Sequence, residues 1–206
     1  MIRKQIARLT CAVFTGLLLL SPSTFAAVKV GQPAPDFSGT LTSGETVKLS
    51  DYRGKTVVLE WTNHDCPYVR KHYGAGNMQA QQLAATGDGV IWLSIISSAP
   101  GEQGYVEAAE ADALTQQRKA SPTGVILDPE GTIGQQYGAR TTPHMYIIDP
   151  EGTLQYMGGI DSIPSSSPGD IQRATQYVPA ALAQLAAGQA VSPSVTRPYG
   201  CSVKYR

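Results

Sequence analysis

The chain has 206 residues, and its 16 Lys and Arg residues balance its 16 Asp and Glu residues. Aromatic residues make up only 7% of the sequence, and it contains no basic block, so nothing supports electrostatic binding to nucleic acid or to an anionic membrane. We expect a neutral or small partner.

The N-terminal segment has the pattern of a secretory signal peptide. Three basic residues precede an apolar run that ends at Leu20, and Thr24-Phe25-Ala26 follows as a small-residue processing site. The apolar run is too short to span a bilayer, which needs about 20 apolar residues, so a cleaved signal is favoured over a membrane anchor. We predict that residues 1–26 are a signal peptide and that the mature protein is periplasmic or secreted, without a stable membrane anchor.

Residues 27–206 are enough for one domain with a sizeable core and too few for two. Cys11 leaves with the signal peptide, so the mature chain keeps only Cys66 and Cys201. Two cysteines in an exported chain predict one disulfide, permanent or transient, because the compartment is oxidising.

The first half of this domain predicts a hairpin, a buried strand and a helix. Residues 37–41 and 46–49 flank a turn that contains glycine. Residues 56–63 form a near-continuous apolar run, as a buried strand does. A helix should begin at Cys66 or Pro67, because proline suits the first helical turn.

The following elements are read from the same patterns. They are a second helix from Asn77 to Ala85, a strand over 89–98, a helix over 103–119, a strand over 125–128, a helical turn over 133–137, and a strand over 145–148 with a hairpin partner over 153–159. The strand, helix, strand succession predicts a parallel pair of strands.

A C-terminal extension begins at about Asp161, where the composition changes to Ser, Pro and Gly. It predicts a helix over 175–187 and then a Pro- and Ser-rich tail that carries Cys201. Because tails without periodicity are usually mobile, we expect this one to be mobile.

Cys66 is the main candidate for a chemical role. A thiol at the first turn of a helix meets unpaired backbone N–H groups and the positive end of the helix dipole, which lower its pKa. Arg70 and Lys71 are expected to add positive potential, whereas Asp65 opposes it. A buried cysteine that only packs is the alternative, but the strand-Cys-Pro-helix context favours a reactive thiol.

Other polar residues near this motif are candidates. Glu60 lies in an apolar strand, either half buried or at an edge, and could relay protons. His64 is a base, a metal ligand or a surface residue. His72 is expected at the surface, because it lies roughly 240° around the helix from Cys66.

Pro143 stands at the entrance of the strand over 145–148. A cis Thr142–Pro143 bond would expose the carbonyl and N–H of Thr142 as an edge on which an extended peptide or thiol docks. A trans proline is also common at a strand entrance.

Three segments, "LEWTNHDCPYV", "YGARTTPHMYIIDPEGTL" and the closing "GCSVKY", together resemble the thioredoxin-like superfamily. They resemble most closely its peroxiredoxin-like redoxin branch (alkyl hydroperoxide reductase/thiol-specific antioxidant), with an N-x-x-C-P-x-V motif and a C-terminal Gly-Cys-Ser. The resemblance runs from Val30 to the end. It implies an α/β thioredoxin-like fold: a central mixed sheet flanked by helices, an N-terminal β-hairpin, and a C-terminal helix plus tail.

The resemblance also implies roles for single residues. Cys66 would be the attacking cysteine, Pro143 the cis proline beside it, Glu60 the match of a buried acid, and Cys201 a candidate resolving thiol. Val69 replaces the second cysteine of the thioredoxin Cys-x-x-Cys, so a vicinal disulfide is impossible.

Two departures weaken peroxidase chemistry. Asn63 stands where typical peroxiredoxins carry Thr or Ser, although its amide could still donate a hydrogen bond, and Pro143 stands where they carry Arg. Arg140 is near that place without matching it. We predict catalytic roles for Cys66, Cys201, Pro143, Glu60 and Asn63, and substrate contacts for Thr142, Pro67, His64 and Arg140.

The leading hypothesis is an exported thiol oxidoreductase without a cofactor, whose partner is a protein or small-molecule thiol or disulfide, or a peroxide. A second hypothesis is a copper- or metal-binding protein that uses Cys66, His64, His144 and Cys201. A third is a non-catalytic module stapled by a permanent Cys66–Cys201 disulfide.

Overall fold

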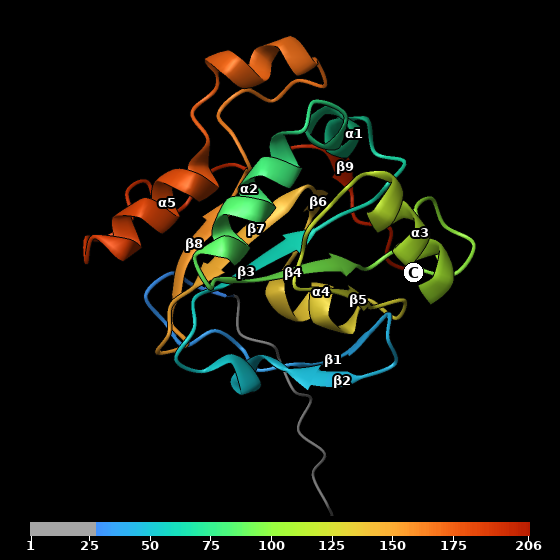
Figure 1. Ribbon diagram of the computed structural model, residues 1–206. Helices are drawn as coiled ribbons and strands as arrows, with labels where there is room; N and C mark the ends of the chain where they lie inside the picture. Colours follow the sequence, from blue (N-terminus) through green and yellow to red (C-terminus); the bar gives the residue numbers. More distant parts are fainter. Residues whose placement is uncertain (1–27) are drawn as a thin grey trace, which may run out of the picture.

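The computed structural model describes residues 28–206, so the predicted signal peptide lies outside the described residues. A seven-stranded mixed sheet forms the centre (Figure 1). Its strands are, in spatial order, β2 (Thr46–Lys48), β1 (Ser38–Leu41), β5 (Gly124–Leu127), β4 (Ile91–Ile96), β3 (Val57–Trp61), β7 (His144–Ile148) and β8 (Leu154–Gly158). A separate two-stranded ribbon joins β6 (Thr141–Thr142) to β9 (Cys201–Ser202).

The helices are those that the sequence predicts, with shifted ends. They are α1 (Pro67–Gly74), α2 (Asn77–Gly87), α3 (Ala108–Gln117), α4 (Thr132–Tyr137) and α5 (Tyr177–Ala186), with short 3-10 turns η1 (Leu49–Tyr52) and η2 (Pro168–Arg173). The prediction that the third helix starts at residue 103 is wrong, because residues 103–107 form turns and extended chain before α3. Among residues 28–206, no helix is both long and apolar enough to cross a membrane.

The central strand β3 is buried along its whole length, as its apolar run predicts. It runs parallel to β4 and antiparallel to β7. The parallel pairing of β4 with β5 confirms the predicted crossover through α3. The N-terminal hairpin of β1 and β2 is also confirmed, and β1 extends the sheet by pairing with β5. Together these pairings give the α/β, thioredoxin-like architecture with a mixed sheet.

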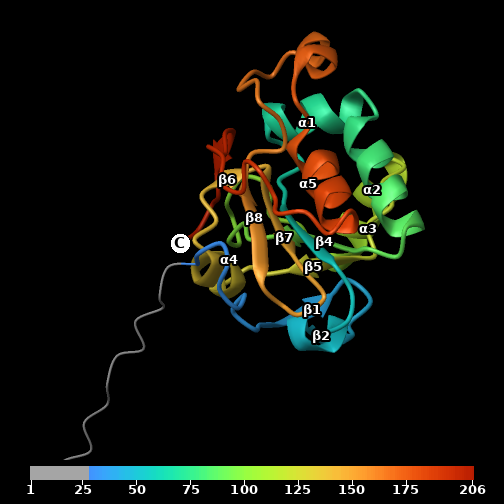
Figure 2. The same ribbon diagram turned by 90° about the vertical axis from the view of Figure 1, so that its left-hand side faces the viewer.

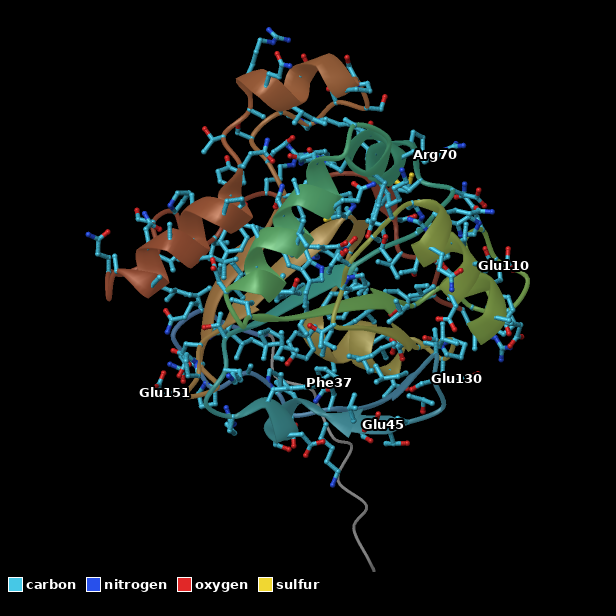
Figure 3. All side chains as sticks on the ribbon, viewed as in Figure 1. Phe37, Glu45, Arg70, Glu110, Glu130 and Glu151 are labelled. Atoms are coloured by element: carbon cyan, nitrogen blue, oxygen red, sulfur yellow. The ribbon has the colours of Figure 1, made fainter. Side chains whose placement is uncertain are left out.

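Alternate residues of the strands build two cores on opposite faces of the sheet. Leu59 and Trp61 of β3 face α4, whereas Val58 faces α1, α2 and α5. Figure 2 shows this division, with α4 on one side of the strands and the other helices on the opposite side. On the α4 face, Trp61 packs at centroid distances of 5.6 Å from Tyr137 and 5.1 Å from Tyr146. Phe37, labelled in Figure 3, meets Tyr137 edge-on.

The C-terminal extension returns to the body of the domain. Residues after α5 run back along β8, where Met157 pairs with Val195, and end in β9 beside β6 (Figure 1). The N–H of Val203 donates to the carbonyl of Arg140 at 3.0 Å, and the N–H of Ala99 donates to that of Lys204 at 2.9 Å. The tail is therefore docked on the domain, where the sequence predicts a segment without fixed contacts, because its backbone pairs with residues that are distant in the sequence.

A substitution at Gly39 tests how closely the N-terminal hairpin packs against the rest of the sheet. A Cβ atom at Gly39 would lie 2.8 Å from Cγ2 of Ile126 and 3.2 Å from Cδ1 of Ile133. We expect Gly39→Ala to lower the free energy of unfolding by about 1–3 kcal/mol through overpacking, measured by urea denaturation. Gly74→Ala is the control, because nothing lies within 4 Å of its Cβ position. Equal unfolding midpoints for the two variants would contradict this packing.

Candidate functional site

The Cys66 thiol lies at the junction of β3 and α1. Cys66 is the N-cap residue of α1 with extended backbone (φ −70°, ψ 123°), and Pro67 occupies the first turn, as predicted. The N–H of Cys66 donates to the carbonyl of Asn63 at 3.1 Å, and the N–H of Arg70 donates to the carbonyl of Cys66 at 2.9 Å. The tight turn after β3 thus fixes the sulfur at the N-terminus of α1.

The Thr142–Pro143 bond is cis, as the family resemblance implies. It lies opposite Cys66, and the thiol of Cys66 donates to the carbonyl of Thr142 at 3.1 Å. Thr142 is 2% exposed. Its backbone edge is occupied by the chain's own tail, because Thr142 is the register partner of Cys201 in the antiparallel β6–β9 ribbon.

Cys201 lies next to Cys66 through this pairing. The backbone N–H of Cys201 donates to the sulfur of Cys66 at 3.4 Å. Both cysteines are free; Cys66 is buried and Cys201 is half-buried. Gly200 makes the close approach feasible, since it has φ +133° and a Cβ atom there would lie 2.0 Å from the carbonyl oxygen of Thr142.

The two thiols have opposite pKa shifts. Burial acts to raise the pKa of Cys66, but the Cys201 side chain, the backbone N–H groups of Val69 and Cys201, and the side chain of Thr142 bring it below its ordinary value. Burial and then Cys66 itself raise the pKa of Cys201 to about 11. Cys66 is therefore the thiol that ionises first, which is the order a nucleophile and a resolving thiol require.

Lys71 does not supply the positive potential that the sequence predicts. Its ammonium is buried and pairs with Asp161 at 3.1 Å. The groups that lower the pKa of Cys66 are hydrogen-bond donors and Thr142, rather than cations. Arg70, labelled in Figure 3, is exposed, and its charge acts on Cys201, where it lowers the pKa.

The expectation that His72 lies at the surface is wrong. His72 is fully buried, and its Nε2 lies 3.3 Å from the hydroxyl of Tyr199. Asn77 lies 2.8 Å from the other ring nitrogen. Tyr199 comes from the C-terminal extension and Asn77 from the start of α2. These elements cover this face of α1, which the helical angle alone does not reveal.

Glu60 is fully buried on the central strand β3, so both expected placements, half buried or at an edge, are wrong. Its carboxylate accepts hydrogen bonds at 2.8–3.0 Å. The donors are the hydroxyl of Tyr73, the amide of Gln82, the indole N–H of Trp92 and the hydroxyl of Ser94. Four neutral donors in a buried site compensate the loss of water around the carboxylate.

Asn63 is buried and its amide is already engaged. Its Nδ2 donates to the carbonyl of Gln103 at 3.0 Å, and its Oδ1 accepts from the N–H of Asp65 at 2.9 Å. It packs against Gly104, where a Cβ atom would lie 2.3 Å from the Asn63 side chain. Asn63 thus joins the loop before Cys66 to the loop before α3.

The other predicted site residues lie around this centre. His64 faces Asp65 at 3.5 Å, with 21% of its side chain exposed. The exposed Arg140 holds the tail through its carbonyl. His144 is buried and contacts the hydroxyl of Tyr146 at 3.2 Å. Among the residues that the structure describes, no group of three or more His, Cys, Asp or Glu side chains is arranged to hold a metal ion.

Comparison with known proteins matches most of the domain to one family. The model of the AhpC/TSA family matches residues 30–157. A thioredoxin-dependent peroxide reductase from Drosophila melanogaster is 47% identical over 55 residues, which are 25% of this chain and 24% of that protein. The match thus spans about a quarter of that relative's length.

Solved structures share the fold. A conserved protein from Geobacillus kaustophilus that is described as uncharacterized superposes with a TM-score of 0.71 and 22% identity, covering 89% of this chain and 94% of its own. The thioredoxin domain of a thiol-disulfide oxidoreductase from Bacteroides vulgatus gives 0.50 and 18%, covering 71% of this chain and 98% of its own.

The pKa of Cys66 tests the hydrogen bonds around its sulfur. We expect Cys66 to titrate below the usual thiol value of about 8.5, as followed by the pH dependence of its alkylation and mass analysis of its peptide. Cys201→Ala should raise this pKa, because the largest lowering contribution comes from the Cys201 side chain. Cys201→Ser keeps a donor and should change it less. Titration of wild-type Cys66 above the usual value would contradict the assignment.

Two buried histidines predict that the free energy of unfolding decreases as the pH falls. Burial lowers the pKa of His72 to about 4 and that of His144 to about 3. An unfolded histidine has a pKa of about 6.5, so below that pH the unfolded state binds more protons and stability falls. The free energy of unfolding in urea should decrease between pH 7 and pH 5. His144→Leu should make this slope shallower, and a flat profile in the wild type would oppose the prediction.

Proposed function

Because the chain belongs to the AhpC/TSA family, we propose that it is an exported thiol oxidoreductase in which Cys66 attacks and Cys201 resolves. The observation that carries the proposal is the contact of 3.4 Å between the backbone N–H of Cys201 and the sulfur of Cys66. It is supported by the opposite pKa shifts of the two thiols.

The proposed reaction moves two electrons from the two thiols to the substrate. The Cys66 thiolate attacks one sulfur of a disulfide, breaks the S–S bond and forms a mixed disulfide while a thiolate leaves. With a peroxide, it breaks the O–O bond and forms a sulfenic acid while hydroxide or alkoxide leaves and takes up a proton. Cys201 then attacks the Cys66 sulfur, which forms the Cys66–Cys201 bond and releases the second thiol or water. An external dithiol returns both cysteines to the reduced state.

Disulfides are the substrates that the site favours. Asn63, the residue that could have donated to a peroxide, already binds Gln103 and Asp65. Pro143 supplies no side-chain donor in place of the arginine. The Drosophila relative carries the name of a peroxide reductase, so peroxide is the second substrate class to test. We retain Pro143, Thr142, Pro67 and Glu60 as site residues, and His64 and Arg140 as substrate contacts.

Access to Cys66 requires movement of the tail. Cys66 is 0% exposed, and Cys201, the ribbon partner of Thr142, lies against it with its backbone nitrogen 3.4 Å from the sulfur. The ribbon that covers it is two residues long in each strand, Thr141–Thr142 and Cys201–Ser202. We propose that β9 leaves β6 to admit a substrate and returns for the resolving step.

The structure gives less support to a permanent staple. The tail is docked while both cysteines are free. Backbone pairing at Val203 and Lys204 and the buried hydroxyl of Tyr199 hold it without a covalent bond. A disulfide between Cys66 and Cys201 is therefore not needed to place the tail, which fits a bond that forms and breaks.

The product of a single turnover tests this function. The reduced mature protein should lose the mass of two hydrogen atoms after one equivalent of glutathione disulfide or of hydrogen peroxide, with the Cys66 and Cys201 peptides joined. Cys201→Ser should stop at the glutathione adduct or the sulfenic acid, and Cys66→Ser should not react.

The two oxidants separate the two substrate classes, because a disulfide exchanger reacts with glutathione disulfide and is slow with peroxide. An unchanged mass with both oxidants would contradict the proposal. Formation of the bond without reduction by any dithiol would instead favour the staple.

A further inference from the structure

A buried polar cluster fixes the chain two residues before Cys201. It consists of Lys71, Asp161 and Tyr199, which we name the tail anchor. The Lys71 ammonium lies 3.1 Å from Oδ2 of Asp161 and 3.4 Å from the hydroxyl of Tyr199. That hydroxyl donates to Oδ1 of Asp161. The remaining donor capacity of Lys71 is used by the carbonyl of Ile163 at 3.2 Å.

The cost of this cluster argues for a role beyond stability. The side chains of Lys71 and Asp161 are 0% exposed, and burying an ion pair costs several kcal/mol per ion before their attraction offsets it. Apolar side chains of the same volume often stabilise a protein at least as well. Unlike apolar side chains, the charged pair fixes the position of Tyr199, because its hydrogen bonds to Lys71 and Asp161 form only at that position.

The tail anchor joins the two segments that carry the thiols. Lys71 lies on α1, the helix that begins directly after Cys66. Tyr199 precedes Gly200, whose positive φ turns the chain into β9 and onto Cys66. The tail anchor therefore ties the segment that carries Cys201 to the helix that positions Cys66. Figure 1 shows β9 beside α1 and β6.

We propose that Tyr199 is a positioning residue that sets the balance between exposure of Cys66 and resolution by Cys201. This inference rests on the proposed function. When the tail anchor is intact, β9 covers Cys66 and keeps the Cys201 thiol beside it. When Tyr199 loses its hydrogen bonds to Asp161 and Lys71, β9 leaves β6 more often, so substrates reach Cys66 faster and Cys201 meets the oxidised Cys66 more slowly.

The test measures the two steps separately in Tyr199→Phe, which removes only the hydroxyl. Rapid-quench mass analysis with excess glutathione disulfide gives the rate of the first adduct on Cys66 and the rate of its closure to the Cys66–Cys201 bond. The ratio of closure rate to adduct rate should fall about tenfold, the effect expected for a lost hydrogen bond to a charged group. Both rates are measured under conditions in which circular dichroism shows the variant to be as folded as the wild type, so that partial unfolding does not account for the change.

Tyr68→Phe is the matched control. The Tyr68 ring packs against that of Tyr199 with centroids 5.8 Å apart, and its hydroxyl makes no hydrogen bond to the part of the chain that the structure describes. Its ratio should equal that of the wild type. In a second background, Lys71→Met with Asp161→Leu, the hydroxyl keeps only His72 as a partner, so adding Tyr199→Phe should change the ratio less than it does in the wild type.

A Tyr199→Phe ratio within twofold of the wild-type ratio overturns the positioning role. A full effect of Tyr199→Phe in the doubly substituted background overturns the assignment of Lys71 and Asp161 as its partners. A wild-type protein that forms no Cys66–Cys201 bond disproves the proposed function instead, so the two failures are distinguished.

Discussion

The antiparallel pairing of Thr142 with Cys201 is the contact on which the geometry of the site depends. It brings a thiol from the end of the chain to a thiol at the start of α1, across 135 positions of sequence. The carbonyl of Thr142 receives the Cys66 thiol, while the N–H of Cys201 points at the same sulfur. One short ribbon thus provides both the surroundings of Cys66 and its proposed redox partner.

The electrostatic asymmetry of the dithiol follows from this contact. Burial disfavours thiolate at both sulfurs, but Cys66 collects the donors of Cys201 and of the first turn of α1. Cys201 supplies a donor and is left with a raised pKa. Cys66, the thiol that ionises first, is therefore also the buried one. The position of β9 affects both the pKa of Cys66 and the access of a substrate to it. In the proposed mechanism, a tail that is held too tightly limits attack, and one that is held too loosely limits resolution.

Features that depend on neighbouring residues were predictable from the sequence. The apolar run of β3 and the Cys66-Pro67 helix start are local, and both are confirmed. The local sequence left the Thr142–Pro143 bond open between cis and trans, and the cis form that the family resemblance implies is the one observed. The tail anchor was not predictable, because Lys71 lies 90 positions from Asp161 and 128 from Tyr199 and no motif joins them. Contacts between residues far apart in the sequence also bury His72 and dock the tail, so the sequence predicted an exposed histidine and a mobile tail. A lysine directly before a histidine in a helix with apolar neighbours was the only local signal.

The central claim is that Cys201 is docked beside Cys66 before any bond forms between them. Amide hydrogen exchange of the fully reduced protein tests it most directly at Val203, whose N–H donates to the carbonyl of Arg140 at 3.0 Å. We expect this amide to exchange far more slowly than an unstructured amide, and oxidation to change its rate little. Exchange at the unstructured rate in the reduced protein, with protection only after oxidation, would contradict the account.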